Sequence, residues 1–393
     1  MESIQDLEKS YHFDLYRRLP VTLVKGKGIH VWDSNGKEYV DFVSGIAVNA
    51  LGHCHPAMIK AIKKQSKKLI HTSNIFYTAP QARLARLLSR ISGFERVFFC
   101  NSGLEANEAA IKLVRKTGNM IGKKGPIITF SGAFHGRSIA SITMGSDKLQ
   151  QSFGPLPEGF LRLPFNDTDA LQKNVNEDTT AVFVEAVQGE GGVIPASSEF
   201  MDALQELCQK NKVLLVFDEI QTGFGRTGYL FGYMNYPIKP DIITIAKALG
   251  GGFPIGAVLT SDEISRNFEH GNHGTTFGGN PLACSAAISV VKTIMDQGLV
   301  ENANKKGSYL FSCLGKMAAE LPIIKEVRGK GLMAGIELIV PCRPIVLKML
   351  GKGCLVNCTV ENTIRLLPPL IVKKKDIDYI IKNLHKVLSE EKA

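Results

Sequence analysis

The stretch from Val213 to Gly228 reads VLLVFDEIQTGFGRTG and restricts the fold more than any other part of the chain. Its five apolar residues do not alternate with polar ones, so both faces of the strand that they form should be covered, as in a central strand of a helix-flanked parallel sheet. In open α/β sheets ligands bind beyond the carboxyl ends of the strands. Asp218 directly follows this strand and is therefore expected at a ligand site, although a carboxylate in this position can also simply cap the next turn.

Strand-like and helix-like segments alternate through the middle of the chain, and longer helical patterns replace them after about residue 285. Such alternation predicts an α/β fold with a mostly parallel central sheet flanked by helices. We expect a large domain at residues 46–285 and a smaller α+β domain built from the N-terminal segment 1–45 and the C-terminal part 286–393. The expected strands are 97–100, 127–130, 181–187, 213–217, 241–246 and 257–260, with a strand pair within 326–338; the expected helices include 106–116, 198–210, 282–297, 301–321 and 376–391.

The formal net charge of +10 raises the question of a nucleic-acid partner. The lysines, however, occur in short pairs and triplets that suit solvated helix faces, and no stripe of aromatic residues accompanies them. We therefore expect small anionic substrates and no nucleic acid. No apolar run is long enough to cross a bilayer and no apolar leader is visible, so we expect a cytoplasmic protein without a membrane partner. The eight cysteines of such a chain are expected to be reduced thiols.

The stretch CNSGLEA at residues 100–106 joins a strand to a helix. A Ser-Gly pair at such a turn presents a hydroxyl and free backbone N–H groups to an anion, and the helix dipole adds to the attraction. These groups suit a phosphate. The same letters are also an ordinary helix N-cap, so the stretch alone leaves both interpretations open.

A single lysine, Lys247, stands at the end of the apolar segment ITIA and before three glycines. Burial at such a position would lower the pKa of the amine and free its lone pair for attack on a carbonyl group. A surface lysine at a strand end is the alternative. Two further stretches need the same explanation: FHGR at 134–137, with an aromatic ring and a guanidinium, and GTTFGGNP at 274–281.

Pyridoxal 5′-phosphate (PLP) accounts for all of these stretches together. It needs a phosphate cradle, an aromatic ring for stacking, a lysine for covalent attachment and a carboxylate that keeps the pyridine nitrogen protonated. In a dry site the attraction between Asp218 and that nitrogen is several times its value in water. The sequence therefore predicts a PLP enzyme.

The ordered blocks SGLEA, FHGR, VEAVQGEGG, VFDEIQTGFGRTG, IAKALGGGFP, HGTTFGGNP and IRLLPPL resemble the class III aminotransferases of PLP fold type I, over essentially the whole chain. The resemblance implies that Lys247 forms the Schiff base and Asp218 pairs with the pyridine nitrogen. It also implies a homodimer with a shared active site, to which the neighbouring subunit contributes Thr276. Leu104 stands where the family often has Ala or Thr, a change that a backbone contact tolerates. The other implied cofactor contacts are Gln221 near the ring hydroxyl, Phe134 and Ile220 on the ring faces, and Ser102, Gly103 and Leu104 at the phosphate.

The same resemblance implies how one site accepts two unlike substrates in turn. Glu190 would pair with Arg365 while the amino donor is bound. When 2-oxoglutarate enters, its α-carboxylate would displace Glu190 and take the guanidinium, and Arg137 would hold the distal carboxylate. Lys247 would move the proton, and the kinetics should be ping-pong. A plain structural ion pair between Glu190 and Arg365 is the alternative.

The identity of the amino donor is less restricted by the sequence. Ile46 falls where ornithine δ-aminotransferases usually carry tyrosine, and an apolar side chain cannot bind a free α-amine, which favours an N-acylated ornithine. Tyr16 and Arg18 resemble part of the segment that lines this pocket in enzymes acting on N2-acetylornithine, which is the expected donor. N-succinylornithine, N-succinyl-diaminopimelate, 4-aminobutyrate and ornithine stay open. A same-fold aminomutase and a non-catalytic PLP-binding protein are the remaining alternatives.

The adjacent residues His53, Cys54 and His55 resemble a metal cluster at first sight. No further ligand block matches the spacing of a structural zinc site, and the stretch is similar to a GHxHP segment that is common in the family. We therefore expect no metal site.

Overall fold

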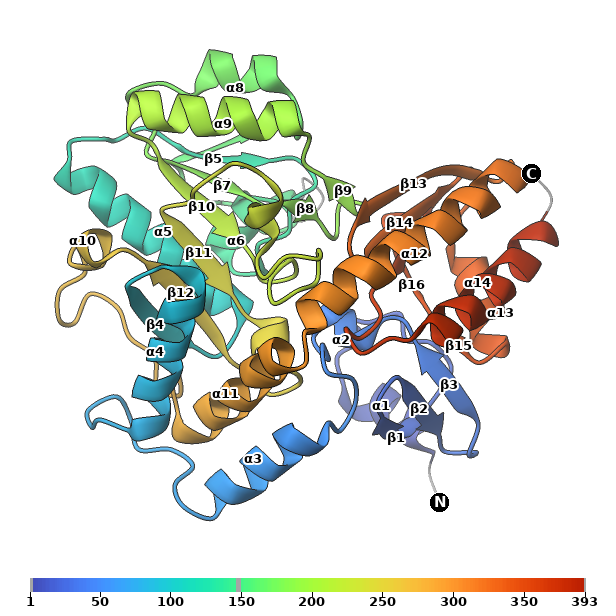
Figure 1. Ribbon diagram of the computed structural model, residues 1–393. Coiled ribbons are helices and arrows are strands. Elements are labelled where there is room, and N and C mark those ends of the chain that lie inside the picture. Colours follow the sequence, from blue (N-terminus) through green and yellow to red (C-terminus); the bar gives the residue numbers. More distant parts are fainter. Residues whose placement is uncertain (1–2, 146–149, 392–393) are drawn as a thin grey trace.

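The computed structural model describes residues 3–145 and 150–391, and its largest feature is a seven-stranded sheet (Figure 1). β12 pairs antiparallel with its neighbours β11 and β4, whereas the other neighbouring strands pair in parallel. The predicted α/β class with a mostly parallel sheet is confirmed, with one strand reversed. In order across the sheet the strands are β4 (Arg96–Cys100), β12 (Gly256–Thr260), β11 (Ile242–Ile245), β10 (Leu214–Asp218), β7 (Ala181–Val184), β5 (Ile127–Phe130) and β6 (Phe160–Leu163).

The central strands form where the sequence is continuously apolar, because helices cover both faces of the sheet. Every residue of β5, β7 and β11 is buried. All six predicted strands lie on observed ones, except that the expected segment 181–187 is divided. Its last residue belongs to β8 (Val187–Gln188), which pairs with β9 (Ile194–Pro195) outside the large sheet.

Helix α5 (Gly103–Met120) packs against β11 and β12 with a row of small residues that lets the helix approach the sheet closely. The helix begins at Ser102, whose hydroxyl accepts a hydrogen bond from the Glu105 amide at 3.2 Å. Helix α11 (Pro281–Asp296) packs on α3 (Pro56–Ser66) and α4 (Ala79–Ser92). The remaining helices and 3-10 turns of this part are α2 (Ser44–Ala47), α6 (Ile139–Thr143), α8 (Thr168–Asn174), α9 (Ser198–Asn211), η1 (Gly232–Asn235), η2 (Lys247–Leu249) and α10 (Asp262–Ser265).

The two ends of the chain lie together on the right of Figure 1 and form two four-stranded sheets. One sheet joins N-terminal strands to a C-terminal one, since β15 runs parallel to β3 with Cys354 opposite Val40. The long helix α12 (Leu299–Glu320) leads from α11 into this part. The sheets have the orders β1 (Leu23–Lys27), β2 (His30–Asp33), β3 (Glu38–Asp41), β15 (Cys354–Leu355) and β13 (Ile324–Lys330), β14 (Met333–Leu338), β17 (Thr363–Leu366), β16 (Asn357–Thr359), with helices α1 (Ile4–Tyr11), α13 (Arg343–Gly351) and α14 (Lys374–Ser389).

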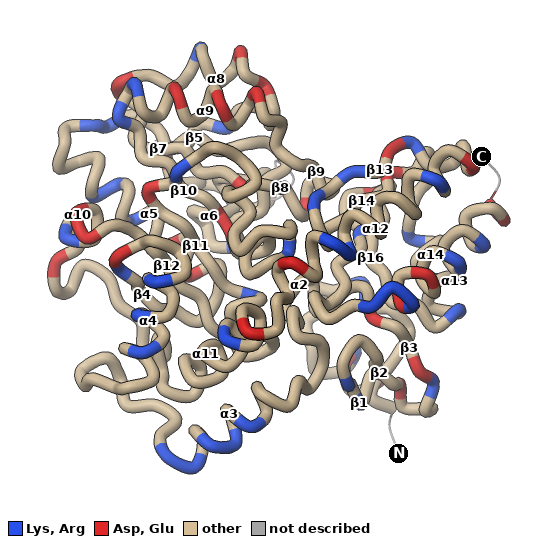
Figure 2. The backbone as a smooth tube through the Cα atoms, in the orientation of Figure 1, with Lys and Arg blue, Asp and Glu red and all other residues tan. Residues whose placement is uncertain are grey.

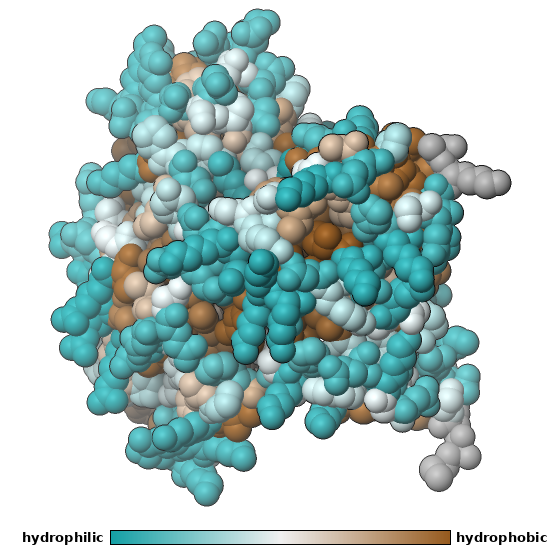
Figure 3. All heavy atoms as spheres, turned by 45° about the vertical axis from the view of Figure 1, so that its right-hand side comes forward, coloured by the Kyte–Doolittle hydropathy of each residue, from teal (hydrophilic) through white to brown (hydrophobic). Residues whose placement is uncertain are grey.

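A disulfide joins Cys342, just before α13, to Cys358 on β16. The expectation that every cysteine is a reduced thiol is wrong for this pair, because sequence spacing does not reveal that α13 and β16 pack side by side. Polar side chains cover most of the face shown in Figure 3, and apolar surface appears in hollows between them. Among the described residues no single helix is both long and apolar enough to cross a bilayer; only α11 and α12 together, across a bend of 62°, reach that length and composition.

Candidate active site

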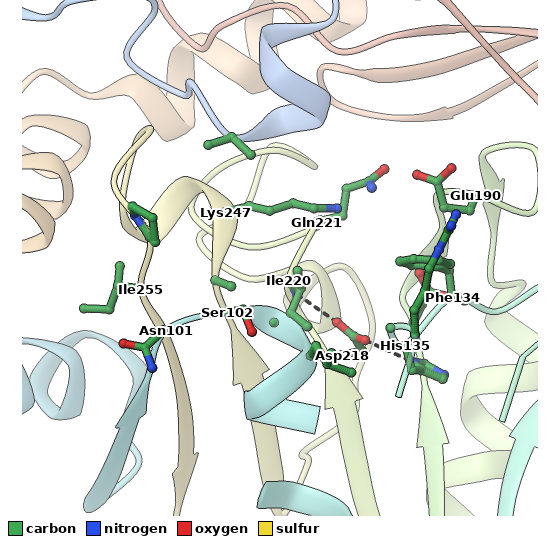
Figure 4. A pocket seen from close by; sticks show the side chains of 18 of the residues that line it. Asn101, Ser102, Phe134, His135, Glu190, Asp218, Ile220, Gln221, Lys247 and Ile255 are labelled. Carbon is green, nitrogen blue, oxygen red and sulfur yellow. Dashed lines mark hydrogen bonds and ion pairs between the residues drawn. The ribbon is translucent and has the colours of Figure 1, made fainter. Parts of the chain in front are cut away.

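A cavity of about 510 Å³ lies at the carboxyl edge of the large sheet (Figure 4). Its walls follow directly from strand ends: β4 leads to Ser102, β10 ends at Asp218, and β11 leads to Lys247. The reversed strand β12 begins at the same edge, next to Ile255. Parallel strands with one reversal thus bring residues from positions 48 to 255 to one place.

Asp218 is 4% exposed and is held by three hydrogen bonds. The ring nitrogen Nδ1 of His135 and the side-chain amide of Asn107 each lie 2.8 Å from Oδ2, and the Ile220 amide donates to Oδ1 at 3.0 Å. Figure 4 shows Asp218 between Ile220 and His135. The carboxylate is therefore fixed in orientation and kept away from water, which strengthens its attraction for a cation in the cavity.

Burial alone would lower the pKa of His135, but the hydrogen bond and the charge of Asp218 outweigh it and raise this pKa. Glu185, which follows β7, also lines the cavity, and burial raises its pKa to about 8. Burial therefore favours the neutral form of this carboxyl group.

Lys247 does not continue β11 but starts the short 3-10 turn η2, with a left-handed φ of 40°. Burial lowers the pKa of its amine, although the nearby charge of Glu190 works in the opposite direction. In Figure 4 the side chain reaches across the cavity toward Gln221. A lysine with a lowered pKa in a cavity is the form of the residue that attacks a carbonyl group.

The N-terminus of α5 faces the same cavity with Ser102, Gly103 and Leu104. Within the described chain no acceptor is found for the backbone N–H groups of Gly103 and Leu104, as expected for the first turn of a helix. A Cβ atom at Gly103 would lie 2.7 Å from Ile220 Cδ1, so only glycine allows these N–H groups to approach the cavity wall so closely. An anion such as a phosphate fits this turn.

These groups together fit PLP on the chemistry of the donors alone. A buried carboxylate faces the cavity from one strand end, an amine of lowered pKa from the next, and free N–H groups from a helix terminus. Ile220 and Phe134 line the space between them. The arrangement matches a ring with a cationic nitrogen, an aldehyde and a phosphate.

Arg365, on β17, is 1% exposed and donates from Nη1 to Glu190 Oε1 at 2.6 Å. The same nitrogen contacts the Gly189 carbonyl oxygen at 3.1 Å and Gln221 Oε1 at 3.4 Å. Burial alone would raise the pKa of Glu190, but the charge of Arg365 outweighs it and lowers this pKa. The pair joins the C-terminal part of the chain to the cavity wall, where Glu190 stands beside Lys247.

The other sequence-predicted residues lie farther out. Arg137 lines the cavity but is exposed, with its guanidinium carbon 5.8 Å from the centre of the Phe134 ring. Thr276, Tyr16 and Ile46 are exposed and are not part of the cavity lining in the single chain. Tyr16 instead lies beside Arg18 in the N-terminal segment.

Three residues of the site were not identified from the sequence. The FHGR stretch drew attention for its aromatic ring and its guanidinium, and not for His135. Asn107 lies one turn into α5, and Glu185 follows a strand end with no other polar side chain to mark it. A histidine beside the stacking ring was the signal for His135. Glu219, next to Asp218, instead has a structural role, since it accepts hydrogen bonds from the Gly232 and Tyr233 amides at 2.7 Å.

The stretch from His53 to His55 is also structural. His53 Nε2 lies 2.7 Å from Asp41 Oδ2, and the His55 ring accepts a hydrogen bond from the Ala57 amide at the start of α3. In residues 3–145 and 150–391 no group of three or more His, Cys, Asp or Glu side chains is arranged to hold a metal ion.

Comparison with known proteins agrees with this geometry. The family profile described as aminotransferase class-III matches residues 14–388. The acetylornithine aminotransferase of Methanocaldococcus jannaschii is 50% identical over 98% of both chains, and that of Caldanaerobacter subterraneus is 48% identical with the same coverage. Among solved structures, the ornithine aminotransferase of Toxoplasma gondii is similar with a TM-score of 0.95 and 32% identity, covering 99% of this chain and 96% of that one. The acetylornithine aminotransferase of Elizabethkingia anophelis has a TM-score of 0.90 and 34% identity, covering 98% of both.

A profile match over nearly the whole chain, relatives near 50% identity and the fold of solved aminotransferases all point to one family. The chain belongs to the class III aminotransferases of PLP fold type I: it is an enzyme that moves an amino group from an amino donor to a keto acid and depends on pyridoxal phosphate.

Proposed function

We propose that this enzyme transfers the terminal amino group of N2-acetylornithine to 2-oxoglutarate, giving the semialdehyde and glutamate. The observation that carries the proposal is the Glu190–Arg365 pair, at 2.6 Å, beside the amine of Lys247. An enzyme that alternates between a cationic or neutral donor and a dicarboxylate needs an arginine whose charge can be covered and uncovered. The relatives near 50% identity bear the name acetylornithine aminotransferase, which supports the choice of donor.

The cofactor, when bound, withdraws electrons from the substrate carbon that bears the amino group. Asp218, oriented by His135, would keep the pyridine nitrogen protonated, and Ser102 with its two neighbouring N–H groups would hold the phosphate. Lys247 Nζ would hold the cofactor covalently at rest and then move the proton from the substrate carbon. Gln221 would contact the ring hydroxyl, and Phe134 and Ile220 would lie against the two ring faces.

The carboxylate of 2-oxoglutarate would replace Glu190 at Arg365. Glu190 is free to leave because its side chain is 35% exposed, whereas Arg365 is held in place by the Gly189 carbonyl oxygen. Arg137, at the exposed rim of the cavity, would hold the distal carboxylate. Arg365 would thus stay in place, and Glu190 would move aside when the substrate carboxylate binds.

A homodimer with a shared active site completes the proposal. Thr276 is exposed in the single chain and would reach the phosphate of a neighbouring subunit. The segment 69–77 exposes Ile75 at 82% and Tyr77 fully, and the centre of the His71 ring lies 5.1 Å from that of Phe277, itself 59% exposed. Large apolar side chains exposed together indicate a protein interface.

The choice of amino donor depends on Ile46 and Tyr16. Both residues are exposed in the single chain, and a second subunit would enclose them. Ile46 has a left-handed φ of 60° in α2, next to Ala47 and Val48, and Val48 lines the cavity. An apolar side chain there offers no partner to a free α-amine. Ornithine is the second candidate, because solved ornithine aminotransferases share the fold at 32% identity.

The test is a donor comparison. The purified protein with PLP receives N2-acetylornithine, N-succinylornithine, N-succinyl-diaminopimelate, ornithine or 4-aminobutyrate together with 2-oxoglutarate, and glutamate is measured. We expect the highest kcat/KM with N2-acetylornithine, and the Lys247→Ala variant should lose covalently held cofactor and nearly all turnover. A preference for ornithine would refute the argument from Ile46, and an absence of glutamate would favour an aminomutase or a protein without turnover.

A further inference from the structure

The positive charge of the chain is concentrated in one segment. Between Asp41 and Glu95 there is no acidic residue, while the same stretch holds eight lysines and arginines. The chain as a whole has a formal charge of +10, so this stretch alone contributes +8. Helices α3 and α4 lie within it, and Figure 2 shows the basic positions along α3.

Five cations from this segment, together with Lys292 on α11, surround one cavity of about 460 Å³. The cavity lies where α3 and α4 pack on α11, and it shares no lining residue with the catalytic cavity. On α4, spacings of three and four residues place the three arginines on one face. The six cations are Lys64 near the end of α3, Lys68 just after it, Arg83, Arg86 and Arg90 on α4, and Lys292 on α11.

None of these six side chains forms an ion pair or donates a hydrogen bond to another described residue. Elsewhere in the molecule arginines do find partners: Arg96, only six residues beyond Arg90, donates to Asp262 at 2.5 Å. Like charges gathered without counter-charges repel one another, and each costs stability that a bound anion would restore. The cluster therefore has the electrostatics of an anion site and not of a salt-bridged helix surface.

The floor of the cavity differs from its rim. Leu87 and Ile288 provide apolar surface, and Ser285 Oγ donates to Gln65 Oε1 at 3.2 Å between them. The volume lies within the range of small-molecule sites, which is roughly 300–1,000 Å³. A basic rim over an apolar floor suits a ligand with several negative charges and an organic body.

We propose that this pocket binds an oligophosphate, as carried by a nucleoside triphosphate, at a site separate from the phosphate turn of α5. Arginines on α4 can hold phosphate oxygens with two parallel hydrogen bonds, and Lys64 and Lys68 add point charges. The apolar floor would accept the organic part of the ligand.

The experiment uses the PLP-saturated enzyme, so that the cofactor already occupies the phosphate turn of α5. Inorganic triphosphate and ATP are titrated in separate arms by calorimetry. We expect saturable binding of one anion per chain that weakens with salt. If the apolar floor contributes, ATP binds more tightly than inorganic triphosphate; equal affinities would assign the site to the phosphates alone, and both results support the proposed oligophosphate site.

The chain offers a matched control in the same segment. The variant Lys64→Gln/Lys68→Gln removes two cations that line the pocket, and Lys63→Gln/Lys67→Gln removes two neighbours that do not. We expect the first to weaken triphosphate binding by on the order of tenfold and the second by less than about twofold. Both variants should keep the transamination activity and the oligomeric state of the unmodified enzyme.

Four outcomes would overturn the proposal. Equal weakening by both variants would mean a diffuse surface charge, and no saturable binding by either anion would mean no site. A change of oligomeric state in Lys64→Gln/Lys68→Gln alone would mean that the cations face another subunit. Tight binding of a single-stranded oligonucleotide, weakened equally by both variants, would likewise assign the charge to a nucleic-acid surface instead of a pocket.

Discussion

Replacing Glu190 with glutamine removes the carboxylate that pairs with Arg365 and leaves a neutral amide of the same shape. Arg365 keeps its charge in the variant, so what is lost is the attraction between two opposite charges, which contributes up to about 1 kcal/mol in exposed pairs. Because the Glu190 side chain is only 35% exposed, we take that upper value, about 1 kcal/mol. The carboxylate of 2-oxoglutarate would then displace glutamine ~5 times more easily than glutamate.

The expected result is a KM for 2-oxoglutarate that falls ~5-fold in Glu190→Gln. The KM for the amino donor should rise, because the charge of Arg365 is no longer covered while the donor is bound. Initial rates with each substrate varied in turn measure both constants. Glu326→Gln is the matched control, since Glu326 also pairs with an arginine, Arg328 at 2.7 Å, but lies outside the cavity. Unchanged constants, or a shift of both in the same direction, would refute the role of the pair.

Two further predictions concern stability. Burial lowers the pKa of His135, but Asp218 outweighs it and raises this pKa above 6.5 in the folded protein. The stabilisation that His135 gives the folded state is therefore present below pH 6.5 and is lost as the pH rises through the folded pKa. In denaturant titrations the free energy of unfolding of the unmodified enzyme relative to His135→Gln should be greater at about pH 6 than at about pH 9, and a constant difference would contradict this. The Cys342–Cys358 disulfide closes a loop with a separation of 16 residues and should contribute about 3 kcal/mol, so Cys342→Ser should unfold at lower denaturant concentration than the unmodified enzyme without reductant and at the same concentration with it. Equal midpoints under both conditions would show that the bond does not form in solution.

Much of the fold could be predicted because a short, continuous apolar segment is compatible with few structures other than a strand buried on both faces. The strands at 127–130, 214–218 and 242–245 follow directly from their buried patterns. The direction of β12 could not be predicted, because strand direction depends on which neighbours a segment meets and not on its own letters. The prediction of a single strand over 181–187 is wrong for a similar reason, because residue 187 belongs to β8, which pairs with β9 outside the large sheet.

In the site, too, residues next to a strand end could be predicted, whereas contacts between residues from different elements could not. Asp218 was found because it follows a strand, and strand ends gather at one edge of a parallel sheet. Its partners His135 and Asn107 come from two other elements, and their contacts arise only when the sheet and α5 pack together. Lys247 was expected at a strand end, whereas a left-handed turn in fact aims it across the cavity. Its lowered pKa follows from burial, as expected.

The positions of the site residues along the chain determine the order in which they are synthesised. Residues 48 to 255 supply the whole wall of the catalytic cavity, but the guanidinium beside Glu190 comes from β17, close to the last helix. A ribosome therefore finishes the wall more than a hundred residues before it adds the cation at position 365. A chain that stops short of β17 would contain every residue that lines the cavity in the single chain, but it would lack the cation that pairs with Glu190.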